Sequence, residues 1–153
     1  NYDLMNGSPE YKAKIMEAAR QLGVFWRGRI GQKDLARELM RASVLVYPGP
    51  HDFCETYGIT FLEAKAAGCV QVTRNNGALP ETNKHGIIRK NDSREDEWVT
   101  AIQEALAYSD AARTKMRLWA HTQTWETVAI RIIARAIEVE KASSSVAVET
   151  AAD

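Results

Sequence analysis

Short apolar runs alternate with amphipathic segments along this chain of 153 residues, and this alternation constrains its fold more than any other feature. Val44–Tyr47 and Val70–Thr73 are apolar runs of strand length. The segment between them, from about Gly58 to Ala67, has the pattern of a helix, and Gly68 suits a helix end. Strands that alternate with helices build parallel sheets. We therefore expect an α/β fold with a parallel sheet and flanking helices.

The rest of the chain follows the same alternation up to about residue 141. The other expected elements are helices at 9–22 and 34–42, a helical turn at 79–82, short strands at 24–26 and 87–88, and three helices that begin near Ser93, Asp110 and Thr124. The tryptophans are expected in the core: Trp26, Trp98, Trp119 and Trp125. After Lys141 the helical periodicity is lost, so we predict a domain over residues 1–141 and a disordered tail over 142–153.

Charge and cysteine content narrow the classes of function. Lys plus Arg and Asp plus Glu number 20 each, and a balanced charge argues against wide nucleic-acid binding, which needs a basic excess. Two cysteines do not make a disulfide framework, which favours reduced thiols and a cytoplasmic location. No apolar run approaches the roughly 20 residues of a membrane span. Asn1 is not a natural start and no signal peptide follows it, so we expect a fragment of a longer protein.

The loop after Tyr47 carries the richest chemistry. In parallel sheets ligands bind beyond the carboxyl ends of the strands. Here Glu55 precedes Gly58, which opens a helix whose first amides lack partners and attract anions. Glu63 lies within that helix, and a carboxylate accepts two neighbouring hydroxyl hydrogen bonds, as a sugar diol offers. On their own, two glutamates at this spacing are more typical of a helix cap and a solvated surface group than of a sugar-binding site.

An ordered set of motifs adds a family resemblance. The segments are Val44-Leu-Val-Tyr-Pro48, Glu55-Thr-Tyr-Gly-Ile-Thr-Phe-Leu-Glu63, Val70-Gln-Val-Thr73 and Gly77-Ala-Leu-Pro-Glu81. In this order they resemble the C-terminal, donor-binding half of the retaining GT-B glycosyltransferases of group 1, with their Glu-x7-Glu motif. Departures include Thr56-Tyr57 where the family has Gly-Phe, and Cys69 where Pro is common. The resemblance covers roughly residues 24–140.

The resemblance implies a Rossmann-like domain that binds a nucleotide-diphosphate sugar, UDP- or GDP-linked, and transfers the sugar with retention of configuration. It implies neither a cofactor nor a metal. By position, Glu55 is the catalytic residue that contacts the sugar, and Glu63 binds the ribose. The remaining implied donor-binding residues are Tyr57, Gly58, Ile59 and Thr60 near the diphosphate, and Gly28 and Arg29 near the nucleobase. His51, in the loop before Glu55, is a further candidate for contact with the sugar or a phosphate, although a histidine in such a loop is more often solvated.

Some of the family pattern is not found in this sequence. The family's Phe-x-Gly-Arg…Lys segment, the first two strands and the N-terminal acceptor-binding domain have no counterpart here. We therefore expect the chain alone to be inactive, and peripheral membrane contact of the full protein stays open. A non-catalytic α/β nucleotide-binding or interaction module is the alternative. A dehydrogenase needs Gly-x-Gly-x-x-Gly after the first strand, which is absent. Arg29, Lys33 and Arg74 suit either phosphate neutralisation or a surface role.

Overall fold

The computed structural model describes residues 8–49 and 54–150, with the side chains beyond Lys141 excepted. The chain divides into two compact units, Asn1–Leu35 and Ala36–Asp153. The division falls within helix α2 (Gln32–Arg41), whose residue Leu39 is buried. The units are described one at a time.

The first unit contains helix α1 (Pro9–Gln21), which begins where the sequence predicts. The Ser8 hydroxyl accepts a hydrogen bond from the Tyr11 amide at 3.3 Å and caps the helix. The strand predicted at 24–26 is wrong: this segment is irregular, and the side chains of Phe25 and Trp26 are 88% and 48% exposed. A lone apolar segment cannot satisfy its backbone groups as a strand, and none of the described strands pairs with it.

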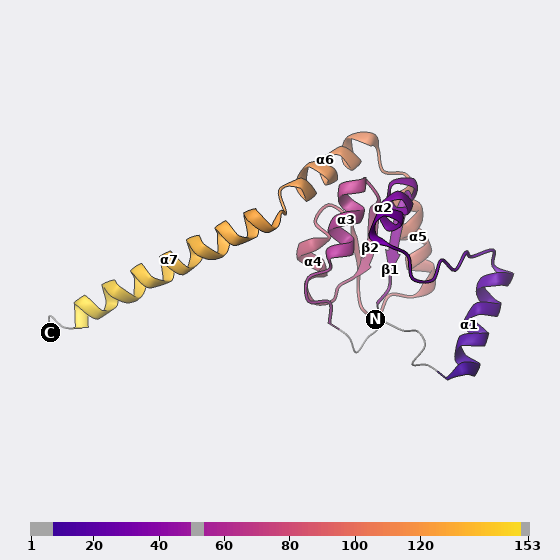
Figure 1. Ribbon diagram of the computed structural model, residues 1–153, viewed down its shortest axis with the longest axis horizontal. Helices are drawn as coiled ribbons and strands as arrows, with labels where there is room; N and C mark the ends of the chain where they lie inside the picture. Colours follow the sequence, from indigo (N-terminus) through magenta and orange to yellow (C-terminus); the bar gives the residue numbers. More distant parts are fainter. Residues whose placement is uncertain (1–7, 50–53, 151–153) are drawn as a thin grey trace. The chain divides into compact units, whose positions relative to one another are not determined.

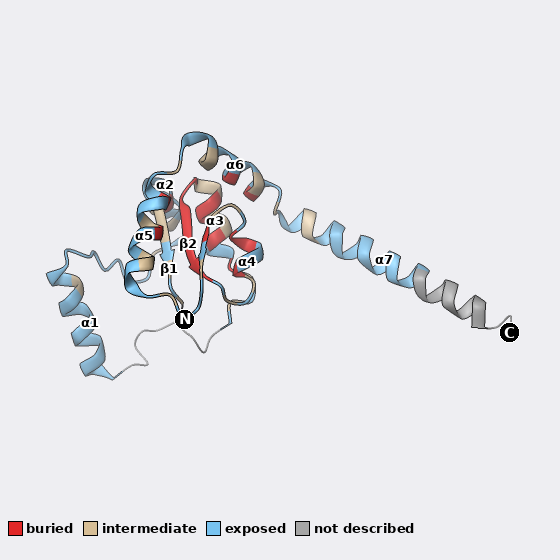
Figure 2. Ribbon diagram, turned by 180° about the vertical axis from the view of Figure 1, so that it is seen from behind, coloured by how far each residue is buried: buried red, intermediate tan, exposed pale blue. Residues whose placement is uncertain are grey.

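The second unit is built on three parallel strands. They are β1 (Val44–Tyr47), β2 (Val70–Arg74) and β3 (Ile87–Arg89), in that spatial order. Val44 lies opposite Val70, and Val72 lies opposite Ile87. Every residue of β2 is buried, as Figure 2 shows, whereas β1 is half-buried and Val46 is 40% exposed. The α/β class with a parallel, Rossmann-like sheet is confirmed.

Helices cover both faces of this sheet (Figure 1). Helix α3 (Ile59–Ala67) packs on one face and α5 (Glu95–Leu106) on the other, and the unit also contains α4 (Leu79–Thr82), α6 (Asp110–His121) and α7 (Trp125–Thr150). On one face Val70, Val72 and Ile87 form the core with side chains of α5 and α6, among them Ala105 and Met116. Trp98, which the sequence analysis expects in the core, is partly buried and packs against it.

On the other face Asn83, next to α4, holds β2 and β3 together. Its Nδ2 donates to Thr73 Oγ1 at 2.8 Å and to the Ile87 carbonyl at 3.1 Å. These bonds stabilise the carboxyl half of the sheet, because Asn83 is 1% exposed and a buried amide needs partners.

The helices of the second half begin close to the predicted positions. Helix α5, predicted near Ser93, begins at Glu95, and the Arg94 amide before it donates to the Glu97 carboxylate at 2.8 Å. Helix α6 begins at Asp110 as predicted, and the Ser109 hydroxyl accepts from the Ala112 amide at 3.2 Å. Helix α7 begins at Trp125, next to the predicted start, and the Thr124 hydroxyl accepts from the Thr127 amide at 3.1 Å.

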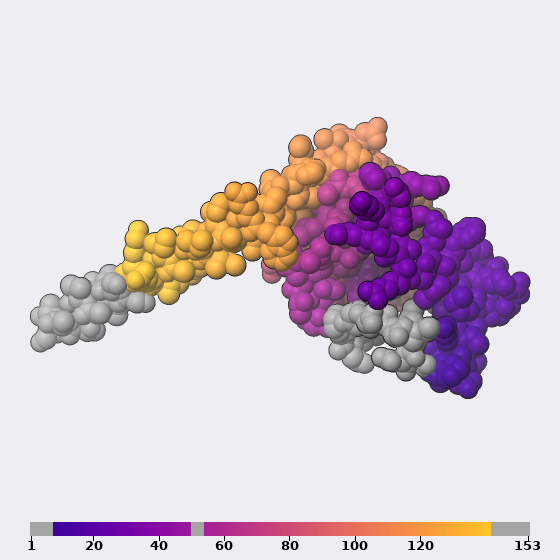
Figure 3. Space-filling model, in the orientation of Figure 1, coloured from indigo at the N-terminus to yellow at the C-terminus, as the bar shows by residue number. Residues whose placement is uncertain are grey.

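Helix α7 differs most from the sequence-based expectation. It runs to Thr150 and so includes residues 142–150, which the sequence assigns to a tail. The boundary between a domain at 1–141 and a tail at 142–153 stays a prediction. Its apolar side chains are exposed, among them Ile130, Ile132 and Ile133 at 61%, 64% and 59%. Figure 3 shows the described part of the helix, in orange and yellow, at the molecular surface. Trp125 is 70% exposed, so the core positions predicted for Trp26 and Trp125 are wrong, and Trp119 is half-buried.

Among the described residues, no helix has the length and apolar character that crossing a membrane requires. Cys54 and Cys69 are both free thiols, the first exposed and the second buried. Burial raises the pKa of the Cys69 thiol to about 11.

Candidate functional site

The start of α3 combines a required glycine with free helix amides. Gly58 is buried and has a φ of +76°, and a Cβ there would lie 2.5 Å from Cδ2 of Phe61. Only glycine fits this position without displacing the ring. No described side chain caps the helix, and the Phe61 amide donates to the Gly58 carbonyl at 3.0 Å, so the amides before Phe61 keep their capacity to bind an anion.

Glu55 is held just before this helix by its backbone and by its side chain. Its carbonyl accepts from the Ala78 amide at 2.8 Å, and its half-buried carboxylate accepts from the Tyr57 amide at 3.4 Å. Gly77 has a φ of +54°, and a Cβ there would lie 2.1 Å from the Glu55 carbonyl oxygen. The turn after β2 therefore fixes the Glu55 backbone next to the start of α3.

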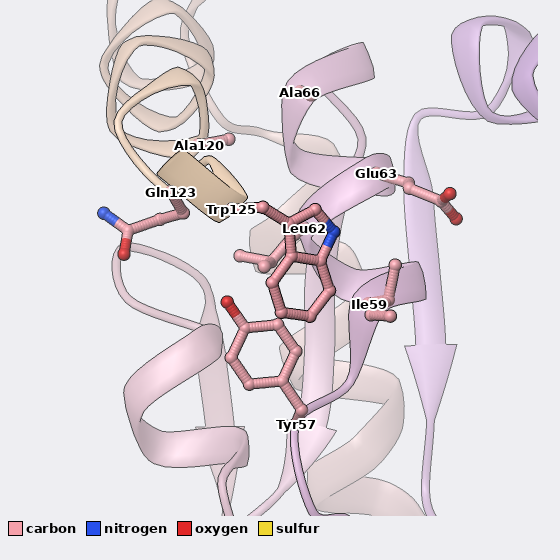
Figure 4. Close-up of a pocket in the computed structure, with 8 residues that line it drawn as sticks. All are labelled: Tyr57, Ile59, Leu62, Glu63, Ala66, Ala120, Gln123 and Trp125. Carbon is pink, nitrogen blue, oxygen red and sulfur yellow. The ribbon is translucent and has the colours of Figure 1, made fainter. Parts of the chain in front are cut away.

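A pocket of about 220 Å³ opens beside α3. Its lining is mostly apolar and comes from the segments before and within α3, the end of α6 and the start of α7: Tyr57, Ile59, Leu62, Glu63, Ala66, Ala120, Gln123 and Trp125. The Tyr57 and Trp125 rings stack with their centroids 5.7 Å apart and an interplanar angle of 19°. Figure 4 shows the Glu63 carboxylate pointing away from this ring pair.

Lys65 fixes the orientation of α3 from its opposite side. The side chain is fully buried, and its Nζ donates to the Thr82 carbonyl at 3.0 Å and to the Lys84 carbonyl. The same atom lies 4.5 Å from the centroid of the Trp119 ring, a cation–π geometry. Burial lowers the pKa of this amine to about 7. One side chain thus joins α3, the end of α4 and α6, and leaves the Glu63 side of α3 free.

The family assignment comes from a comparison with protein-family models. The model described as glycosyl transferases group 1 matches residues 4–118, which include the Glu55–Glu63 segment and all three strands. The chain belongs to the group 1 glycosyltransferases. The predicted family is therefore confirmed, and the protein is a transferase with a role in glycosyl transfer. A search of curated proteins found no match.

The structure of this glycosyltransferase brings most of the predicted site residues together. One loop and one helix carry Glu55, Tyr57, Gly58, Ile59, Thr60 and Glu63. Gly28 and Arg29 belong to the other unit, where Gly28 has a φ of +60° with open space around it. His51 lies outside the described residues. The roles given to all nine residues stay predictions.

Trp125 is one of the pocket residues of the glycosyltransferase that the site prediction does not include. Helical periodicity predicts a core position for it, and its stacking on Tyr57 joins residues far apart in the sequence. Thr124 before it fixes the start of α7 but not the direction of the helix. No group of three or more potential metal-ligating side chains occurs in the part of the chain that the structure describes.

Proposed function

We propose that this chain is the donor-binding part of a retaining glycosyltransferase. It binds a nucleotide-diphosphate sugar, UDP- or GDP-linked, and presents the sugar to an acceptor. The observation that carries the proposal is the uncapped start of α3 at Gly58, with Glu55 before it and Glu63 within the helix. Membership in the group 1 glycosyltransferases supports this use of the site.

The first amides of α3 hold the diphosphate in this proposal. Each helix-terminal interaction with an anion contributes roughly 0.3–1 kcal/mol when exposed and up to about 2 kcal/mol when partly buried. The same amides stabilise the charge that develops on the leaving diphosphate as the glycosidic bond breaks. Since this chemistry needs neither a metal nor a cofactor, we propose none, and we propose retention of the anomeric configuration.

The two carboxylates contact the two ends of the donor. Glu63 lies four residues beyond Ile59, which places it about 6 Å further along the helix axis, a suitable distance for a ribose attached to the diphosphate. Its half-buried carboxylate accepts the two ribose hydroxyls. Glu55 exchanges its bond with the Tyr57 amide for contact with the transferred sugar.

We propose further donor contacts and partners on the strength of the family. Gly28 and Arg29 lie near the nucleobase, and His51 lies near the sugar or a phosphate. An acceptor-binding domain completes the site, so these residues alone transfer little or no sugar. The active protein works in the cytoplasm and has no nucleic-acid partner. Binding of the full protein to lipid vesicles would test for a peripheral membrane contact.

Calorimetric titration of the full chain with UDP, GDP and ADP tests the donor site. We expect saturable binding of at least one of them. Binding without transfer, even when the complete protein is supplied with a sugar nucleotide, would favour the alternative of a non-catalytic module. A folded chain that binds none of the three nucleotides has no donor site of the proposed kind.

The role of Glu63 is tested by combining a substitution at Glu63 with removal of the 2′-hydroxyl from the nucleotide. Wild-type protein should bind UDP or GDP more tightly than the 2′-deoxy form, and Glu63→Gln should lose about tenfold in affinity together with this preference. Glu104→Gln, an exposed glutamate on α5, is the matched control and should bind as wild type. An undiminished ribose preference in Glu63→Gln rules out the assigned contact.

A further inference from the structure

Arg74, the last residue of β2, is buried, and two of its guanidinium nitrogens have no partner in the described part of the chain. Arg74 is only 8% exposed, and its Nε and Nη1 atoms make no hydrogen bond within the described residues. Sequence alone is equally consistent with a surface arginine at this position. The structure instead places it at the carboxyl edge of the central strand, where parallel sheets bind their ligands.

Two more unpartnered groups lie on neighbouring segments. Arg74 lies directly opposite Arg89 of β3 in the parallel register, so both side chains project from the same face of the sheet. Arg89 Nη2 donates to the Glu97 carboxylate at 2.8 Å, which places both arginines on the α5 face, while Arg89 Nε is buried and unpaired. The buried Ser93 hydroxyl, which precedes α5, also has no partner within the described residues.

The charges nearby do not neutralise Arg74. Glu97 pairs with Arg89, and Asp96 pairs with the exposed Arg94 at 2.8 Å. Glu95 is exposed to solvent in the first turn of α5. Two guanidinium groups therefore lie on adjacent strand ends, and the carboxylate of Glu97 pairs with Arg89. Because an unpaired buried charge is strongly unfavourable, this arrangement calls for a further anion.

We propose that Arg74, with Arg89 and Ser93, binds the oxyanion of a ligand, a phosphate or carboxylate group, at the carboxyl edge of β2 and β3 on the α5 face. The planar fork of an arginine matches either group, and the hydroxyl adds a donor.

This subsite is separate from the proposed donor site. Alternation along the strand puts Thr73 on the face opposite to Arg74, and Tyr47 lies opposite Thr73 in the register. The Tyr47 ring contacts Phe61 of α3, with ring centroids 5.1 Å apart, so α3 starts on the other face of the sheet. The inference therefore goes beyond the donor function and does not depend on it.

Titration of the full chain with inorganic phosphate, followed by ³¹P NMR, tests the subsite. We expect saturable binding that Arg74→Met weakens at least tenfold and that Arg74→Lys weakens less. Arg94→Met removes an exposed, paired arginine and should bind phosphate as wild type. Gly58→Ala, which alters the donor site, should keep this phosphate binding. Loss in Gly58→Ala with retention in Arg74→Met would assign the phosphate to α3 and overturn the proposal.

Competition and stability measurements complete the test. Acetate should compete with phosphate for the subsite, and the anion with the lower dissociation constant is the type of group that the subsite prefers. Phosphate binding that does not saturate would overturn the proposal. In phosphate-free buffer Arg74→Met should have a higher denaturation midpoint than wild type, because it removes an unpaired buried charge. Saturating phosphate should raise the midpoint of the wild type and of Arg94→Met, and should raise that of Arg74→Met much less. An Arg74→Met protein that is less stable than wild type, or that fails to fold, makes Arg74 a structural residue and contradicts the proposal.

Discussion

The sheet region, defined here as the described residues of 36–121, and the flanking segments, residues 8–35 and 125–141, are both rich in apolar side chains, yet only the sheet region buries them. Ile87 on β3 is 8% exposed, whereas Ile133 on α7 is 59% exposed. Met116 on α6 is fully buried, whereas Phe25 is 88% exposed. Apolar periodicity therefore identifies the face that an element can bury, but burial requires a second element to cover that face.

The largest expected difference in stability between the two regions comes from replacing an isoleucine by alanine in each. Ile87→Ala should lower the free energy of unfolding by about 2–5 kcal/mol, because it leaves a cavity in the core. Ile133→Ala on α7 should change it by less than about 0.5 kcal/mol. Urea denaturation of the two variants and the wild type measures both values. Equal losses would show that the apolar face of α7 is buried in solution, contrary to this comparison.

The second contrast concerns glycines. Gly58→Ala in the sheet region should lower the free energy of unfolding by about 1–3 kcal/mol, because its φ of +76° and the contact with Phe61 both exclude a Cβ. Gly31→Ala is the matched control in a flanking segment, since a Cβ there meets nothing within 4 Å. Thermal denaturation measures both variants. A Gly58→Ala protein as stable as Gly31→Ala would show that the start of α3 is not held as described.

The third contrast concerns lysines and pH. The Lys65 amine has a pKa of about 7 in the folded protein, below its ordinary 10.5, so the unfolded chain binds more protons between these pH values. Stability should therefore rise with pH across this window, by up to about 1.4 kcal/mol per pH unit. His85 faces the same Trp119 ring, and burial, reinforced by the charges of Lys115, Lys65 and Lys84, lowers its pKa from 6.5. Its titration lies at lower pH. Burial raises the pKa of the Cys69 thiol to about 11, which makes stability fall with pH above about 8.5, so measurements from pH 7.5 to about 8.5 report the lysine.

Lys65→Met should remove most of this slope, since methionine carries no titratable group. Lys141→Met, which changes an exposed lysine of α7, is the control and should keep it. Denaturation curves from pH 7.5 to about 8.5, below the titration of the Cys69 thiol, give the slopes. A slope that persists unchanged in Lys65→Met would assign the pH dependence to other groups.

The smallest expected effect tests the contact between α7 and the sheet region. Trp125→Ala should lower the free energy of unfolding by about 0.5–1.5 kcal/mol through the lost stacking on Tyr57. Ile130→Ala, also on α7 and 61% exposed, should have no measurable effect. Fluorescence-detected denaturation of Tyr57→Ala and the double variant gives the coupling energy of the pair. Strictly additive losses would mean that the rings do not interact.

The sequence predicts best those features that depend on neighbouring residues. The strand Val44–Tyr47 and the helix between Gly58 and Gly68 are confirmed, because apolar alternation and two glycines with positive φ act locally. The strand at 24–26 is wrong because its formation depends on a pairing partner. The burial of Lys65 was not foreseen either, because it depends on α6, which follows much later in the chain.

The candidate site divides in the same way. Glu55, Gly58 and Glu63 lie within nine consecutive residues, so the sequence alone places them around one helix start. The stacking of Trp125 on Tyr57 depends on the direction that α7 takes. The position of Arg74 opposite Arg89 depends on the register of strands β2 and β3. Neither can be obtained from spacing in a single sequence.

The most direct test of the central claim is an amide chemical-shift titration of the isotope-labelled chain with UDP or GDP. The largest shifts should fall on the amides of Gly58, Ile59 and Thr60, because the diphosphate accepts hydrogen bonds at the start of α3. Smaller shifts should follow at Glu55 and Glu63. Saturable binding that leaves these amides unshifted, or that shifts only residues on the α5 face of the sheet, would contradict a donor site at α3.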